Sequence, residues 1–183
     1  MKKLIALLLA LTLVVAFAGC EKKEETKVET VEALAALQTA WNALGDDEKP
    51  FAMGGGYETM VDNAPGAVPT TDTAYLTSIL LVPADQIANI DEAASLVNGM
   101  MLNNFTCGAF HVTGDVKAFA DAMNTAISTN RWMCGMPEKM FVAVIGEYVV
   151  AAFGLNDFMN TFESKLSAAY PAVEYAYNAA ITG

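Results

Sequence analysis

The chain has 183 residues, which is enough for one sizeable domain and short for two. Hydrophobic residues make up 54% of it and charged residues only 17%, and the formal net charge is −11. Such an acidic surface excludes nucleic acid as a partner and offers no attraction to anionic lipid head groups. We interpret the acidity as a means of keeping the protein soluble.

The N-terminus has the parts of an export signal. Met1–Lys3 is basic, and the apolar run Leu4–Phe17 is too short to span a membrane comfortably. With the Ala18-Gly19-Cys20 that follows, it resembles a bacterial lipoprotein signal peptide, although Phe17 stands where that family usually has leucine. The resemblance implies cleavage before Cys20 and lipidation of its sulfur. An ordinary secretory leader with a chance cysteine is the alternative.

The chain is therefore predicted to have three parts: a signal peptide at 1–19, a polar tether at 20–28 and a single domain at 29–183. Two or more acyl chains hold a protein stably on a bilayer, so we expect an anchor on the outer face of the cytoplasmic membrane. Thr26 and Glu29 have capping-box spacing, and apolar residues recur at helical spacing over Val31–Leu44. That amphipathic helix is expected to pack on the domain core rather than on a partner.

The segment Asp46–Thr71 is rich in proline and glycine and has no periodic pattern. Its triple glycine, Gly54–Gly56, invites comparison with a phosphate-binding loop. No Lys-Ser or Lys-Thr follows the glycines and no strand leads into them, so we interpret the segment as a flexible surface loop. Thr73–Val82 is apolar and predicts a short helix or an extended segment before Pro83.

The second half of the chain shows more regular patterns. A helix is predicted from Asn89 or Asp91 to about Met101, and a strand over Phe105–Val112. Further helices are predicted over 115–130, with Asp115 near the start, over 156–169, with Asn156 as the cap, and over 171–181, with Pro171 in the first turn.

Two apolar runs, Phe141–Ile145 and Tyr148–Phe153, are separated by Gly146-Glu147. A two-residue loop with glycine first is typical of a type II′ turn, so we predict a hairpin with Gly146 at positive φ. Both faces of the hairpin are apolar, which predicts cover on both sides. The order strand, helix, hairpin, helix indicates an α+β fold with a small antiparallel sheet flanked by helices. The helices at 115–130 and 156–169 are expected on one face and the helix at 31–44 on the other.

The run from Asn98 to Leu166 resembles a family of small Firmicute lipoproteins that carry a domain of unknown function. The residues that carry the resemblance are Asn98-Gly99-Met100-Met101, Phe110-His111-Val112, Gly146-Glu147-Tyr148-Val149 and Phe162. This resemblance implies no known activity and no site residues. Pro137, Gly146 and Gly154 are also spaced as in the second half of a thioredoxin fold, but the Cys-x-x-Cys of such proteins is absent, so redox catalysis is not expected.

Three cysteines and one histidine could carry chemistry. Outside the cell, Cys107 and Cys134 could form a disulfide, or remain two separate buried thiols. Cys107 and His111 share a strand face, and Met133, Met136 and Met140 surround Cys134, which together could form a soft metal site. The other interpretation is that the methionines fill gaps in the core and that His111 is satisfied by a hydrogen bond. A Cys-His nucleophile would need an electropositive setting, which the net charge argues against.

The loop that enters the hairpin is the candidate binding site. Trp132, Met133 and Met136 could line an apolar surface there, although Trp132 could equally end the preceding helix and pack into the core. The pairs Glu138 with Lys139 and Asp157 with Glu163 are interpreted as solvated faces. We therefore predict a lipid-anchored domain that binds an unknown protein or small molecule without catalysis, cofactor or metal. The alternative is a thiol- or metal-dependent activity at Cys107, His111 and Cys134.

Overall fold

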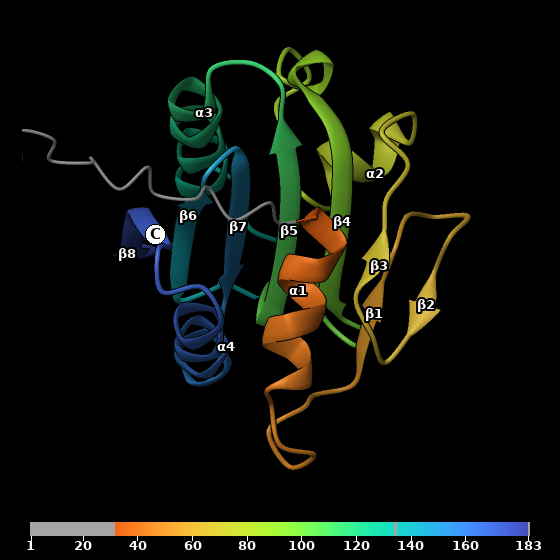
Figure 1. Ribbon diagram of the computed structural model, residues 1–183. Helices are drawn as coiled ribbons and strands as arrows, with labels where there is room; N and C mark the ends of the chain where they lie inside the picture. Colours follow the sequence, from red (N-terminus) through yellow and green to blue (C-terminus); the bar gives the residue numbers. More distant parts are fainter. Residues whose placement is uncertain (1–31, 134, 183) are drawn as a thin grey trace, which may run out of the picture.

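The computed structural model describes residues 32–133 and 135–182 (Figure 1). They form a mixed α/β fold with an open, antiparallel sheet of eight strands and four α-helices. The α-helices are α1 Ala33–Asn42, α2 Thr73–Ser78, α3 Val116–Ser128 and α4 Asn156–Ala169. The strands are β1 Ala52–Gly54, β2 Val61–Asp62, β3 Gly66–Ala67, β4 Ile90–Asn98, β5 Phe105–Val112, β6 Lys139–Ile145, β7 Tyr148–Gly154 and β8 Glu174–Ala180. Two short 3-10 turns lie at Ile87–Asn89 (η1) and Leu102–Asn104 (η2).

The strands follow the order β2-β1-β4-β5-β7-β6-β8, and β3 pairs separately with β4. All pairs are antiparallel. The predicted α+β class and the order strand, helix, hairpin, helix are confirmed. The sheet is larger than the small one predicted, because two segments predicted as helices, 90–98 and 174–180, are strands, and because the segment predicted as a loop supplies β1, β2 and β3.

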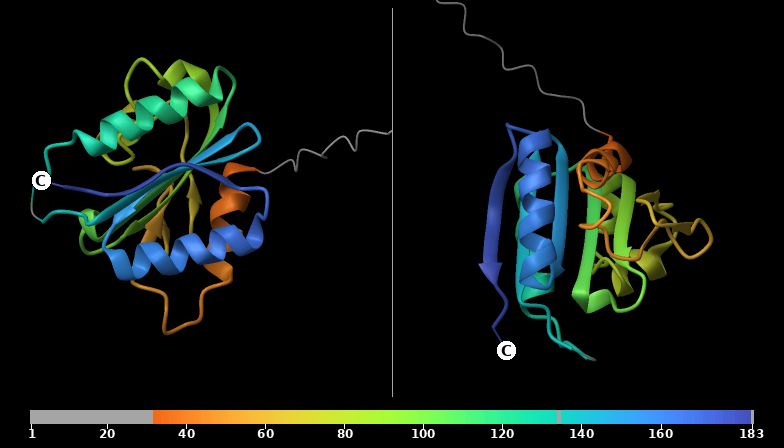
Figure 2. Two further views of the ribbon diagram at one scale, coloured as in Figure 1. Left: turned by 90° about the vertical axis from the view of Figure 1, so that its left-hand side faces the viewer. Right: turned by 90° about the horizontal axis from the view of Figure 1, so that it is seen from below.

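The helices lie on both faces of the sheet (Figure 2, left). α1 and α4 cover one face, where Leu37 and Phe162 pack in one buried cluster, and α3 covers the other, where Phe119 packs with Leu76 of α2. Placing the helices over 115–130 and 156–169 on one face was therefore wrong. The connections β5-α3-β6 and β7-α4-β8 each skip one strand in the same direction along the sheet. Because β5 and β7 are antiparallel, two crossovers of the same hand must lie on opposite faces.

The central hairpin is confirmed. Ile145 pairs with Tyr148 across Gly146 and Glu147. Gly146 has a φ of 61° while Glu147 keeps a negative φ, which is the pattern of a type II′ turn. The two strands are buried on both faces, as predicted.

The two predictions of a helix where the structure has a strand, β4 and β8, were wrong for different reasons. In β4 the apolar residues Ala93, Ala94 and Val97 fit helical spacing, but the run 93–97, apolar except for Ser95, also suits a strand buried on both faces. In β8 the alternation of half-buried Tyr175 and Tyr177 with exposed neighbours has the strand period of two. Pro171 lies in the turn that precedes β8 rather than in a helix.

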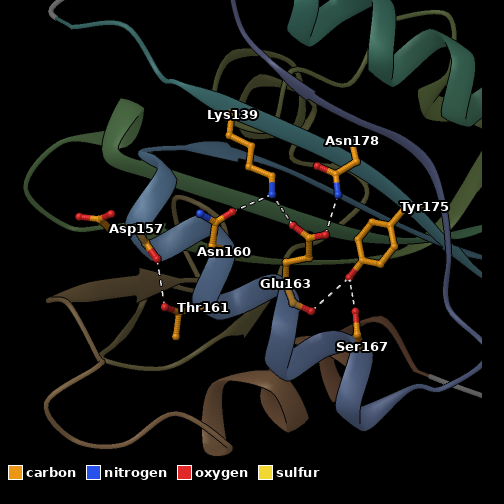
Figure 3. Close-up of polar contacts among 8 residues, drawn as sticks. All are labelled: Lys139, Asp157, Asn160, Thr161, Glu163, Ser167, Tyr175 and Asn178. Atoms are coloured by element: carbon orange, nitrogen blue, oxygen red, sulfur yellow. Dashed lines mark hydrogen bonds and ion pairs between the residues drawn. The ribbon is translucent and has the colours of Figure 1, made fainter.

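A polar network fixes β8 and β6 to α4 (Figure 3). Lys139 Nζ donates to Glu163 Oε2 at 2.6 Å and to Asn160 Oδ1 at 2.8 Å, while Asn178 Nδ2 donates to Glu163 Oε1 at 2.6 Å. Tyr175 Oη donates to the Glu163 carbonyl at 3.2 Å. The Lys139 and Glu163 side chains are only 17% and 19% exposed. Interpreting these two residues as parts of solvated faces was therefore wrong.

The ends of the predicted helices are close to those observed. The predicted start of a helix at residues 113–115 is confirmed, and Asp115 is the cap of α3, its Oδ1 accepting from the Ala118 N–H at 3.0 Å. Asn156 is the first residue of α4 rather than its cap, and the Asn156 N–H is satisfied instead by Glu138 Oε2 at 2.9 Å. The predicted signal peptide, Cys20, the tether, the capping box and Cys134 lie outside the described residues.

Candidate functional site: a methionine-rich surface

The glycine-rich segment is a closely packed part of the sheet and not the flexible loop predicted. A Cβ on Gly54 would lie 2.2 Å from the Gly66 nitrogen, so the backbones of β1 and β3 approach as only glycine allows. Gly55 has a φ of 86°, and a Cβ there would lie 2.2 Å from the Thr59 carbonyl oxygen. The triple glycine therefore shapes the chain that carries Tyr57 and Met60.

Backbone and side-chain hydrogen bonds bring distant segments together at one end of the sheet. The Gly99 N–H donates to the Phe51 carbonyl at 3.0 Å, and the Leu155 N–H donates to the Asn104 carbonyl at 2.9 Å. Asn103 Nδ2 donates to the carbonyls of Met133 and Gly135 at 2.8 and 2.7 Å. The end of β4, the start of β5, the end of β7 and the loop before β6 therefore meet there.

Exposed hydrophobic side chains gather on these segments and on the loop between β1 and β2. Met100 is 82% exposed and Met133 is 77% exposed. We define the methionine surface as Phe51, Tyr57, Met60, Met100, Met101, Leu102, Met133 and Met136, each at least 38% exposed. Met123, Met140 and Met159, in contrast, are buried in the core. Exposed apolar patches of this kind mark interaction sites in soluble domains.

Part of this surface is hollowed. A hollow of about 180 Å³ is lined by Met53, Met60, Met100 and Met101, together with tyrosine, aliphatic, glycine and Asn98 positions, and none of its lining residues is charged. Its floor is rigid, because Tyr75 Oη lies 3.2 Å from Ser95 Oγ, which donates to the Gly55 carbonyl at 3.0 Å. Burial raises the pKa of Tyr75, so this floor stays neutral.

The three residues predicted for binding divide between the surface and the core. Met133 and Met136 lie on the methionine surface. Trp132 packs toward the α3 side of the core, with its ring centroid 4.8 Å from that of Phe153. Its buried Nε1–H has no hydrogen-bond partner among residues 32–133 and 135–182. Trp132 therefore anchors the loop before β6 to the core, while Met133 and Met136 are exposed to solvent.

The structure does not bring the candidate thiol and the histidine together. Cys107 is fully buried in the cluster beneath α1 and α4, and burial raises the pKa of a thiol there, so the position offers no accessible thiolate. His111 shares its strand face but lies four residues further along β5, about 13 Å away at a rise of roughly 3.3 Å per residue. The disulfide with Cys134 stays a prediction, since Cys134 lies outside the described residues. No group of three or more His, Cys, Asp or Glu side chains within the described ranges is placed to hold a metal ion.

His111 belongs to a polar group at the opposite end of the sheet. Its Nδ1 lies 2.5 Å from Asp91 Oδ1 and its Nε2 lies 3.7 Å from Glu147 Oε2, and the ring packs 4.7 Å from Tyr148. The hydrogen bond to Asp91 is the main cause that raises the pKa of His111. A histidine whose protonated form is favoured by two carboxylates joins β4, β5 and the β6–β7 turn, and this pairing suits a structural role better than that of a general base.

Comparison with known proteins identified no relative of this chain. No family model, no curated protein and no solved structure matches the chain. Among the residues that the structure describes, no helix has the length and apolar character needed to cross a membrane.

Sequence patterns identified part of the methionine surface. Met133 and Met136 were found because they flank a glycine and a proline in a loop entering a hairpin. Met100 and Met101 were assigned to a helix that does not exist, so their exposure was missed. Tyr57 and Met60 were missed because their segment had no periodic pattern, and they join the others only through the pairing of β1 with β4.

Proposed function

We propose that the protein is a lipid-anchored, extracytoplasmic binding module that holds an apolar ligand or partner segment on its methionine surface, without catalysis. The observation that carries this proposal is the gathering of exposed methionine and aromatic side chains around an uncharged hollow, on a chain with net charge −11. Methionine side chains are flexible and polarizable, which suits them to apolar partners of variable shape. Kinship to small Firmicute lipoproteins of unknown function is part of the proposal and rests on the sequence motifs alone.

A neutral solvatochromic dye, Nile red, tests the binding role. The dye should bind the full chain, and Met101→Glu should weaken its binding, because a carboxylate in the hollow is costly to desolvate. Ala118→Glu adds the same charge on the exposed side of α3 and serves as the matched control. Equal dye binding by both variants and the unmodified chain would contradict the proposal.

The anchor is tested separately. Cys20→Ser removes the sulfur that would carry the lipid, so the variant should leave the membrane fraction or keep its leader uncut. Mass spectrometry of the mature N-terminus measures the acyl groups directly. An unmodified Cys20 in the wild type would contradict the lipid anchor while leaving the binding role open.

A further inference from the structure

The hollow of the methionine surface continues into two acidic hollows. The second hollow, of about 330 Å³, shares Tyr57 with the first and is lined by Glu58 and Asp72. The third, of about 600 Å³, shares Pro69 and Thr71 with the second and is lined by Asp91 and Glu92. The three hollows therefore form one row, apolar at the methionine surface and acidic further along.

The negative charge in the acidic part of the row is largely uncompensated. Glu58 is exposed and has no bond within the described chain, while Asp72 accepts only from the backbone N–H groups of Tyr57 and Tyr75. Glu92 accepts from the Ala33 N–H, and Asp91 pairs with the imidazole of His111.

The lysines that could neutralise this negative charge pair with carboxylates outside the three hollows. The four lysines of the described chain are paired with other carboxylates, in the pairs Lys49–Asp46, Lys117–Asp121, Lys139–Glu163 and Lys165–Glu48. No lysine, arginine or histidine lines any of the three hollows.

We propose that the partner is a polypeptide segment in which an apolar block is followed or preceded by a block of lysine or arginine residues. This inference rests on the proposed function and names its partner class. The apolar block lies on the methionine surface and the basic block lies over Glu58, Asp72 and Glu92. A small amine or an apolar molecule alone would use one hollow of the row, whereas a segment with both kinds of block uses all of it. Acidic, methionine-rich grooves suit basic amphipathic segments for the same reasons of adaptability and charge.

Two synthetic peptides test this. One carries a leucine block, containing a photo-crosslinking leucine analogue, joined to a lysine block, and the other carries glutamates in place of the lysines. The lysine peptide should bind the full chain, and crosslinking should mark Met60, Met100 or Met101. The glutamate peptide should bind roughly tenfold or more weakly, because like charges meet in the acidic hollows.

A pair of charge reversals is the matched control. Glu58→Lys should weaken the lysine peptide roughly tenfold and strengthen the glutamate peptide, whereas Asp85→Lys, an equal change at an exposed position outside the row, should leave both unchanged. If both peptides crosslink to the methionine surface with equal affinity, the basic partner is overturned while the binding role stands. If neither peptide crosslinks there and Nile red does not bind, both proposals fail.

Discussion

The two ends of the sheet expose different kinds of side chain. At the end with the β6–β7 turn, charged side chains are paired, as His111 is with Asp91 and Glu147. At the other end of the same strands, Met100 and Met133 stand almost fully in solvent. Because β4, β5 and β7 are well buried between these ends, the exposed methionines are not a sign of a poorly packed domain. This difference is the basis of the proposal that the apolar end binds a partner.

The largest expected effect is a difference in stability between alanine variants of two neighbouring residues at the apolar end, Trp132 and Met133. Trp132→Ala should lower the free energy of unfolding by about 3 kcal/mol, since the indole packs on Phe153 but is partly exposed. Met133→Ala should change stability by less than about 0.5 kcal/mol, because its side chain is 77% exposed. Denaturant melts of both variants measure this. Equal losses would mean that the loop does not divide into an inward anchor and an outward surface.

The next effect concerns the polar network beneath the apolar end. Glu163→Ala should cost about 2 kcal/mol, because it leaves the half-buried Lys139 ammonium without its carboxylate and Asn178 without its acceptor. Lys165→Ala breaks the more exposed pair with Glu48 and should cost much less. Thermal melts compare the two. A larger loss for Lys165→Ala would show that the network does not hold β8 in place.

At the polar end, stability should be sensitive to substitution of Gly146 in the β6–β7 turn. Gly146→Val should cost more than about 1 kcal/mol, since a β-branched residue tolerates a φ of 61° poorly. Gly146→Asn is the matched variant, because asparagine visits positive φ more readily, and it should cost less. Unchanged stability of the valine variant in a denaturant melt would contradict the turn geometry.

The smallest effect should come from His111 and depend on pH. Its pKa is raised in the folded protein, so its contribution is fully present below its ordinary pKa of about 6.5 and is lost as the pH rises through the folded pKa. The stability difference between wild type and His111→Gln should be less than about 1 kcal/mol, because Asp91 and Glu147 are exposed. It should be larger at about pH 6 than at about pH 9. Denaturant melts at both values test this, and a difference that grows with pH would contradict the ion pairing.

Several elements could be predicted because their determinants are local. The glycine at the turn, the start of α3 near Asp115 and the apolar stripe of α1 each depend on neighbours within a few residues. Of the candidate site, Met133 and Met136 were found for the same reason, since their own loop marks them. Lipidation at Cys20 also rests on a local pattern and stays a prediction.

What only the tertiary structure decided depends on which segments become neighbours. The apolar run of β4 suits a helix or a buried strand, and pairing with β5 on one side and β1 and β3 on the other decides for the strand. The face that α4 covers follows from the hand of a crossover past β6. The methionine surface joins residues from 51–60 and 100–102 with Met133 and Met136, because the ends of strands far apart in sequence meet where the sheet ends. The sequence by itself determined the β6–β7 hairpin and the helices α1, α3 and α4, whose causes are short-range, while the remaining strands and the site were decided by long-range pairing.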